Sequence, residues 1–290
     1  MKILIAGGQG QLGLALARRL VGTHEVLAPG RSDFDITSRD LCALAVTRAR
    51  PDLVLNCAAY TAVDRAESER DAAFAVNAEG AGNLADACRN AGATLVHFST
   101  DYVFDGSASR PYVESDSVAP QSVYGASKLA GERAVTDSGV DHLILRLSWV
   151  YGNDGGNFYK TMLRLAAERP VLRVVADQWG IPNYTGALAD AIACAIERPT
   201  AELAQLGGLY HLSATGTTNW CQFAGAIIRG AGMAERVVVE AISTSDYPTA
   251  AKRPAYSALD GSRFAATFGW NPPDWQDGLQ RCLAARASAA

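Results

Sequence analysis

The sequence predicts an α/β protein with a doubly wound parallel sheet and a smaller C-terminal α+β lobe. Two observations indicate this fold class. Short, continuously apolar segments alternate with amphipathic segments through the first half of the chain, and a glycine-rich turn follows the first apolar segment. Strands that are apolar on both faces are typical of a parallel sheet covered by helices on both sides.

The alternation is regular up to about residue 150. The apolar segments that predict strands lie at 2–7, 24–28, 51–59, 93–99 and 142–147. Helical patterns come between or beside them, at 11–21, 38–49, 69–91 and 123–138. Parallel strands need such crossover helices, because a short hairpin cannot join them.

The second half of the chain has a looser pattern. Glycines and prolines interrupt it at Gly155, Gly156, Pro170, Pro182, Pro199, Gly207 and Gly208, and residues 247–257 read as a loop. We therefore predict a dinucleotide-binding domain over 1–150. A mainly substrate-binding lobe should follow over 151–290 and return one or two elements to the sheet.

Composition excludes several functional classes. The chain has 290 residues and a net charge of −4, so it lacks the basic surface that nucleic acids or anionic membranes attract. The apolar run at the N-terminus is too short for a signal peptide, and no segment approaches the length of a membrane span. We expect a cytoplasmic protein with neither nucleic acid nor membrane as partner.

The turn AGGQGQLG lies between the first strand and the first helix. Its glycines fit GxxGxxG as Gly7, Gly10 and Gly13, or GxGxxG with Gly8 as the first. Glycine allows a tight turn and lets the backbone approach a pyrophosphate, while the helix N-terminus offers free N–H groups to the phosphates. The strand–turn–helix context favours a dinucleotide site of Rossmann type over a purely structural turn.

The residues after the second strand bear on the choice of cofactor. An arginine there can hold the 2′-phosphate of NADP, whereas an acidic residue would bind the ribose hydroxyls of NAD. The segment offers Arg31, with Asp33 and Asp35 beyond it. Arg31 favours NADPH, with NADH also possible, and Asp35 either contacts the adenine or caps the next helix.

Tyr124 and Lys128 in YGASK lie one turn apart on the helix expected at 123–138. The pair could be a solvated helix face. Beside a nicotinamide, however, Tyr124 could donate a proton to a substrate oxygen, and a nearby ammonium would lower the tyrosine pKa toward neutrality. Ser99 and Thr100 at the carboxyl end of a strand could hold that oxygen.

Several longer motifs resemble one enzyme family. The glycine turn, NCAAYTAVDRAE, FSTDYVFDG, YGASKLAGE and RLSWVYG are similar to those of extended short-chain dehydrogenases/reductases. GGNFYKTML, DQWGIP, GLYHLSATGTTNW and KRPAYSALD extend the resemblance to the dTDP-4-dehydrorhamnose reductases over nearly the whole chain. The resemblance implies NADPH-dependent reduction of the C4 ketone of dTDP-4-dehydro-β-L-rhamnose to dTDP-L-rhamnose, with a nucleotide sugar as substrate.

The resemblance also implies roles for individual residues. It makes Tyr124 the proton donor, with Lys128 as its partner and Thr100 as the third catalytic residue. It places Asp101, Trp149 and Arg253 with Thr100 against the substrate, Arg253 being a contact for the diphosphate. The residues that it places against the dinucleotide, beyond the glycines and Arg31, are Gln11, Leu12, Asp35, Ile36, Ala58, Ala59 and Thr61.

Two departures from the family pattern are visible. Asn183 replaces a threonine in DQWGIPNY. Some relatives hold a bridging metal with acidic residues at two positions, which are occupied here by Ala15 and Gly186. We therefore expect no metal, and a monomer or a metal-free homodimer. The alternatives are another nucleotide-sugar reductase or epimerase, or a non-catalytic regulatory subunit of the methionine adenosyltransferase type.

Overall fold

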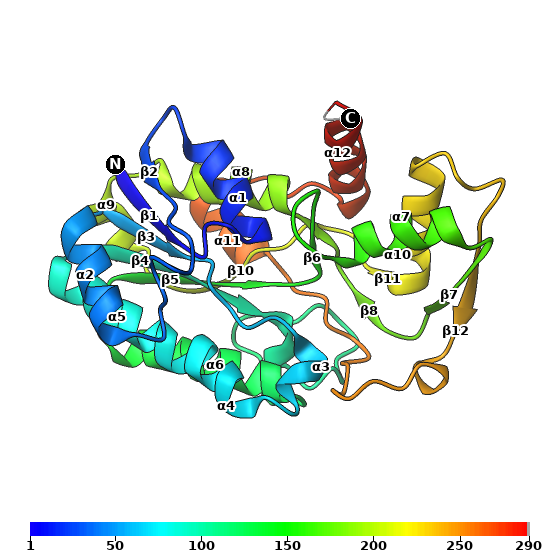
Figure 1. The fold of residues 1–290 in the computed structure, drawn as a ribbon, viewed down its shortest axis with the longest axis horizontal. Helices are drawn as coiled ribbons and strands as arrows, with labels where there is room; N and C mark the ends of the chain where they lie inside the picture. Colours follow the sequence, from blue (N-terminus) through cyan, green and yellow to red (C-terminus); the bar gives the residue numbers. More distant parts are fainter. Residues whose placement is uncertain (289–290) are drawn as a thin grey trace.

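The computed structural model describes residues 1–288, and a six-stranded parallel sheet forms the centre of its larger lobe (Figure 1). Its strand order is β10-β5-β4-β3-β1-β2. The order reverses between β3 and β1, which is the doubly wound arrangement predicted from the sequence. The strands are β1 (Lys2–Ala6), β2 (Glu25–Leu27), β3 (Leu53–Asn56), β4 (Thr94–Thr100), β5 (His142–Leu147) and β10 (Gly208–His211).

Helices cover both faces of this sheet. One face packs on α1 (Gln11–Leu20), α8 (Thr185–Ile196), α9 (Thr200–Gln205) and α11 (Ser262–Phe268). The other packs on α2 (Arg39–Ala49), α5 (Gly80–Ala91) and α6 (Val123–Asp137). The central strands β3 and β4 are buried along their whole length, as their continuous apolar character predicts.

The long helix expected at 69–91 is interrupted. It consists of α4 (Arg70–Phe74), a π-helical turn (Ala75–Glu79) and α5, and the short α3 (Val63–Ala66) precedes it. Asn77 in the π turn accepts a hydrogen bond from the Tyr60 amide (2.8 Å) and donates to the Ser127 hydroxyl (2.9 Å). The extra residue of a π turn thus directs an amide side chain between the strand end and α6.

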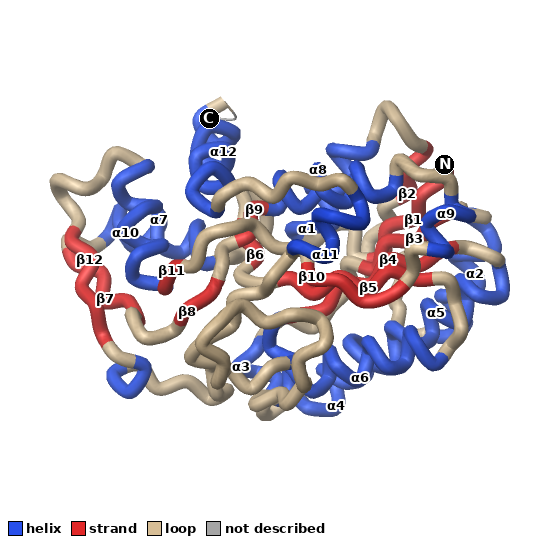
Figure 2. Tube along the Cα trace, turned by 180° about the vertical axis from the view of Figure 1, so that it is seen from behind, coloured by secondary structure: helices blue, strands red, loops and turns tan. Residues whose placement is uncertain are grey.

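A smaller lobe lies at the other end of the molecule (Figure 2). Its own core lies around α7, α10 and α12, with Tyr151, Tyr159 and Phe223 fully buried. Three two-stranded sheets accompany it: β12 with β7, β11 with β8, and β6 with β9. The elements are β6 (Val150–Tyr151), α7 (Phe158–Glu168), β7 (Val171–Val175), β8 (Trp179–Gly180), β9 (Asn183–Tyr184), β11 (Thr218–Asn219), α10 (Trp220–Gly230), β12 (Val238–Ile242) and α12 (Trp275–Ala287).

The chain crosses between the two parts more than once. β10 lies beside β5 at the edge of the large sheet, and α8 and α11 cover that sheet, although all three follow residue 150 in sequence. The division of the chain at residue 150 stays a prediction. Within residues 1–288, no helix has the length and hydropathy needed to span a membrane.

Candidate active site

The glycine turn is shaped by contacts that leave no room for side chains. A Cβ on Gly7, whose φ is +70°, would lie 2.6 Å from the Ala58 nitrogen. A Cβ on Gly13 would lie 2.5 Å from the Gly7 oxygen, so the third glycine lets α1 approach the turn. At Gly10 a Cβ would meet only the Gly7 oxygen, at 3.3 Å. Gly10 is exposed, which is what close approach of a ligand requires.

A pocket of about 270 Å³ opens beside this turn. It lies at the carboxyl ends of β1 and β3, where the strand order reverses. Seven residues that the sequence assigned to the cofactor line it: Gly7, Gly10, Arg31, Asp35, Ile36, Ala58 and Ala59. Five other lining residues were not anticipated: Gln9, Phe34, Cys57, Tyr60 and Val76.

The other residues assigned to the cofactor lie outside this pocket. Leu12 and Gly13 are buried within α1, and Thr61 is exposed after β3. Gln11 reaches toward the smaller lobe: its amide donates to the Gly156 carbonyl (3.2 Å), and its carbonyl oxygen accepts from Asn157 (2.7 Å). Gln11 therefore joins the glycine turn to the segment after β6.

Arg31 and Asp35 stand at the rim of the pocket. The Arg31 side chain is 80% exposed and makes one long contact of 3.4 Å with Asp35. Asp35 accepts hydrogen bonds from the amide (3.0 Å) and the hydroxyl (2.8 Å) of Thr37, which lower its pKa. Arg31 is thus held loosely and can reorient toward an anion.

Thr100 and Tyr124 come together from different elements. Thr100 ends β4, and Tyr124 is in the first turn of α6, whose start is capped by the Ser122 hydroxyl. Gly125 lets this turn approach the Tyr102 carbonyl, because a Cβ there would collide with that oxygen. The Tyr102 ring packs edge-on against the Tyr124 ring, with centroids 5.6 Å apart.

Lys128 follows one turn later and is almost completely buried. Its ammonium donates to the Phe98 carbonyl at 2.6 Å. Burial lowers the pKa of Lys128 to about 8, against the opposing effects of Glu132 and Cys57. The group therefore remains mostly charged at pH 7.

The expectation that Lys128 lowers the pKa of Tyr124 is wrong for this structure. We expected the cation to lower the tyrosine pKa, but burial raises the pKa of Tyr124 to about 12, although hydrogen bonding with Thr100 opposes this. The reason is that the phenol is buried, and Lys128, whose ammonium donates to the Phe98 carbonyl, is not among the groups that lower its pKa. A raised pKa keeps the phenol protonated at pH 7, which suits a proton donor.

Asp101 is a buried carboxylate next to Thr100. Its Oδ1 accepts a hydrogen bond from the Thr100 hydroxyl (3.0 Å), while Oδ2 has no partner at hydrogen-bond geometry. Burial raises the pKa of Asp101 to about 7, and the nearby Ser257 and Thr100 hydroxyls offset part of this effect. A buried, unpaired oxygen beside the catalytic residues can accept a hydrogen bond from a ligand hydroxyl.

Trp149 links the catalytic end of the sheet to the smaller lobe. Its backbone is left-handed, with φ of 45°, and its ring stacks on that of Trp220 with centroids 3.5 Å apart. The indole N–H donates to the Ser257 hydroxyl (3.2 Å). A non-glycine residue in this conformation is strained, so the stack and the hydrogen bond hold it in place.

Arg253 is an ion-paired side chain, not a solvated loop cation. It donates to Asp64 at 2.7 Å, and its side chain is 17% exposed. Its guanidinium lies over the Tyr102 ring, and its Nη1 is buried without a partner. Arg253 thus stands beside the tyrosine that packs on Tyr124, with donors available to an anionic ligand.

Comparison with known proteins decides the family. The sequence matches the family described as RmlD substrate binding domain over residues 1–288. It is 44% identical to the dTDP-4-dehydrorhamnose reductase of Burkholderia thailandensis, over 98% of each chain. The chain belongs to the dTDP-4-dehydrorhamnose reductase family.

Solved structures of this family have the same fold. The dTDP-4-dehydrorhamnose reductase of Clostridium acetobutylicum has a TM-score of 0.93 and 39% identity, covering 99% of this chain and 100% of its own. The enzyme of Bacillus anthracis, solved in complex with NADP, has a TM-score of 0.91 and 40% identity, covering 98% of this chain and 100% of its own.

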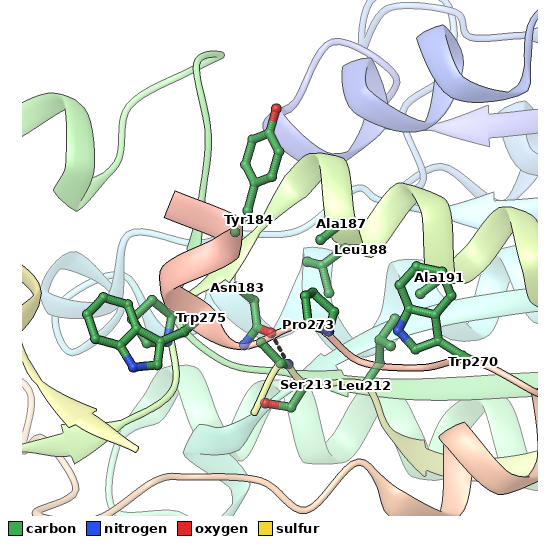
Figure 3. Close-up of a pocket in the computed structure, with 13 residues that line it drawn as sticks. Asn183, Tyr184, Ala187, Leu188, Ala191, Leu212, Ser213, Trp270, Pro273 and Trp275 are labelled. Atoms are coloured by element: carbon green, nitrogen blue, oxygen red, sulfur yellow. Dashed lines mark hydrogen bonds between the residues drawn. The ribbon is translucent and has the colours of Figure 1, made fainter. Parts of the chain in front are cut away.

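Asn183, a departure from the pattern of this reductase family, has a structural role. Its side chain is buried and donates to the Ser148 carbonyl (2.8 Å) and the Ile181 carbonyl (2.9 Å). Its oxygen accepts from the Ala214 amide at 2.7 Å, the dashed line in Figure 3. The cavity of Figure 3 beside it measures about 10 Å³, too little to hold a ligand. Through its hydrogen bonds, Asn183 joins the segments that follow β5 and β10 of the large sheet to the segment between β8 and β9.

The two positions that hold metal in some members of the reductase family are filled differently. Ala15 is buried on α1, and a Cβ on Gly186 would lie 2.5 Å from the Tyr184 ring. Around them, Arg18 pairs with Asp154, and both Arg19 and Arg281 pair with Asp190. The pairs of Asp190 join α8 to α1 and α12, and the Arg18–Asp154 pair joins α1 to the segment after β6.

Proposed function

We propose that this protein uses NADPH to reduce the C4 ketone of dTDP-4-dehydro-β-L-rhamnose, forming dTDP-L-rhamnose. The observation that supports this most is the hydrogen bonding of the Thr100 hydroxyl with the Tyr124 phenol at the carboxyl end of β4, in a sheet whose glycine turn opens onto a pocket. Family membership over the full chain supports the same substrate.

The residues of the chain suit a nicotinamide dinucleotide. Gly10 presents open backbone at the start of α1, and Arg31 offers a loosely held guanidinium for a 2′-phosphate. When bound, the reduced nicotinamide supplies the hydride that ketone reduction needs. Ala58, Ala59 and Ile36 provide apolar walls for the adenosine half.

Tyr124 is the proposed proton donor. Its raised pKa keeps the proton on the phenol until charge develops on the substrate oxygen, and Thr100, whose hydroxyl donates to Asp101, orients the phenol. The charged Lys128 favours this charge development electrostatically and is proposed to hold the nicotinamide ribose. The triad thus needs no metal.

The substrate is proposed to lie between the sheet edge and the smaller lobe. The unpaired oxygen of Asp101 would accept a hydrogen bond from a sugar hydroxyl, and Trp149 would present its ring to the sugar. The free donors of Arg253 would contact the diphosphate.

One assay tests this function. NADPH oxidation is followed at 340 nm with dTDP-4-dehydrorhamnose and with other 4-keto sugar nucleotides as controls. We expect turnover with the first and formation of dTDP-L-rhamnose. An epimerase would convert substrate without net NADPH oxidation. A regulatory subunit of the methionine adenosyltransferase type would copurify with that enzyme and show no turnover of its own. Either result would overturn the proposal.

A further inference from the structure

Glu132 continues the row that Tyr124 and Lys128 begin on α6, each four residues from the last. Glu132 is 6% exposed, and no step described above uses its carboxylate. We propose that Glu132 is a positioning residue, which keeps the Lys128 side chain in its charged form and ties the strand end bearing Thr100 to α6. This inference rests on the function proposed above.

The Glu132 carboxylate is held from two neighbouring strands. Oε1 accepts from the Ser99 hydroxyl (2.5 Å) and from Arg146 Nε (2.8 Å), and Oε2 accepts from Arg146 Nη2 (2.7 Å). Arg146 is 2% exposed. Burial of such an ion pair carries a large desolvation cost, so the pair adds little net stability to the fold. The forked geometry fixes the position of the carboxylate.

Lys128 is buried one helical turn from Glu132 on α6, where its surroundings disfavour the ammonium. Burial acts to lower its pKa, and the Phe98 carbonyl is its hydrogen-bond acceptor. Three ionisable groups act on it or respond to it, Glu132 on α6, Cys57 after β3 and His97 on β4, and the cation of Arg146 on β5 is paired with Glu132. Glu132 is the stronger of the two groups that favour the ammonium, ahead of Cys57. The pKa of His97 lies well below its usual value, first through burial and then through Lys128.

Ser99 connects the same carboxylate to the catalytic hydroxyl. It directly precedes Thr100 at the end of β4, and its backbone lies opposite Arg146 in the β4–β5 register. Glu132 therefore contacts both strands from the helix that carries Tyr124 and Lys128. This arrangement fixes the distance between the Thr100 strand end and the Tyr124 helix, which a proton-transfer site requires.

The test measures Lys128 directly. The chain contains four lysines, so the ¹³Cε signal of Lys128 can be assigned by its loss in Lys128→Met and titrated in the whole protein. In Glu132→Gln, which keeps the side-chain shape, we expect the Lys128 midpoint to fall by about 1 to 2 pH units. NADPH oxidation by this variant should then fall relative to the natural protein as pH rises from 6 to 8.

Matched variants separate the effects of charge and shape. Glu168→Gln removes a carboxylate from the exposed Arg164–Glu168 pair and should change neither readout. Ser99→Ala should lower turnover and leave the Lys128 midpoint unchanged. If Glu132→Gln does not fold, Glu132→Gln with Arg146→Met removes both buried charges. The midpoint should then fall by less than about 1 to 2 pH units, because Arg146 opposes the ammonium that Glu132 favours.

An unchanged Lys128 midpoint in a folded Glu132 variant overturns the charge role, and full turnover in Ser99→Ala overturns the tie to the strand. The lysine titration needs no sugar substrate. A natural protein that gives no turnover would therefore refute the proposed reaction while leaving the inference about Glu132 open to the same measurement.

Discussion

The protonation of each ionisable residue in the site depends on how deeply its side chain is buried. Tyr124, Lys128 and Asp101 are all shifted by burial toward their neutral forms. Arg31, in contrast, is 80% exposed and free to meet a ligand. Buried groups should therefore govern proton transfer, and exposed ones should govern selection of the cofactor.

Tyr124→Phe removes only the phenol oxygen. We expect turnover to fall by roughly 10²- to 10⁴-fold, because general acid catalysis is worth about that much. NADPH should still bind, which fluorescence quenching or calorimetry would measure. Because the pKa of Tyr124 is about 12, the natural enzyme should show no loss of activity from tyrosine ionisation below about pH 10. Near-normal turnover by the phenylalanine variant would refute the role.

Arg31→Ala should reduce the preference for NADPH over NADH. One charged contact with a 2′-phosphate is worth roughly 1.5–3 kcal/mol, or about one to two decades of affinity. Dissociation constants for the two cofactors would be compared, and the NADH constant should stay unchanged. Equal weakening of both would mean that Arg31 supports the pocket structurally.

Asp101→Asn should stabilise the fold in a pH-dependent way. The native pKa of about 7 lies above the unfolded value, so the native state binds more protons between about pH 4 and 7, and stability falls as pH rises through that window. The variant lacks this loss. Its free energy of unfolding in urea, relative to that of the natural protein, should therefore be higher at pH 8 than at pH 4.5, by at most roughly 4 kcal/mol. The exposed Asp71→Asn is the control. An equal effect of Asp101→Asn at both pH values would contradict the prediction.

At the scale of elements, α6 organises the catalytic groups, and its approach to the π turn depends on Gly131. A Cβ there would collide with the Asn77 carbonyl oxygen. Gly131→Ala should therefore destabilise the protein by about 1–3 kcal/mol and lower turnover, because α6 must shift.

Gly82→Ala on the adjacent helix is the matched control for Gly131→Ala. Its Cβ would lie 3.4 Å from the Ala134 side chain, which is an ordinary contact. The substitution should be neutral or stabilise by up to about 1 kcal/mol through helix propensity. Urea midpoints and turnover measure both variants, and similar midpoints for the two would contradict the packing argument.

The sequence predicted those elements whose pattern is local. The alternation of apolar and amphipathic segments was sufficient for five of the six strands of the sheet, β1 to β5, and for the helices α1, α2 and α6. The YxxxK spacing was sufficient for the i, i+4 placement of Tyr124 and Lys128. The edge strand β10 was expected only as an unspecified element returning to the sheet. The two-residue strands β6, β8, β9 and β11 were not predictable, because only pairing with distant segments defines them. The same holds for Ser257 and Asp64, whose partners Trp149 and Arg253 are more than 100 residues away.

At the scale of the whole molecule, the smaller lobe is joined to the large sheet by polar contacts near the glycine turn. Gln11 contacts Gly156 and Asn157, and Arg18 pairs with Asp154. These contacts lie between the proposed cofactor site and the lobe that would hold the substrate. These contacts, together with β10, which returns part of the chain after residue 150 to the large sheet, connect the two proposed sites.

The region around Ala15 and Gly186 leads to a prediction about metal and assembly. A divalent cation needs several oxygen ligands, and neither residue has a side-chain oxygen. The nearby carboxylates of Asp154 and Asp190 are already paired with Arg18, Arg19 and Arg281, whose positive charges repel a cation. We therefore expect NADPH oxidation and the size-exclusion profile, that of a monomer or a metal-free dimer, to survive dialysis against EDTA. Loss of activity or a change in assembly that magnesium restores would show that a metal binds through other residues.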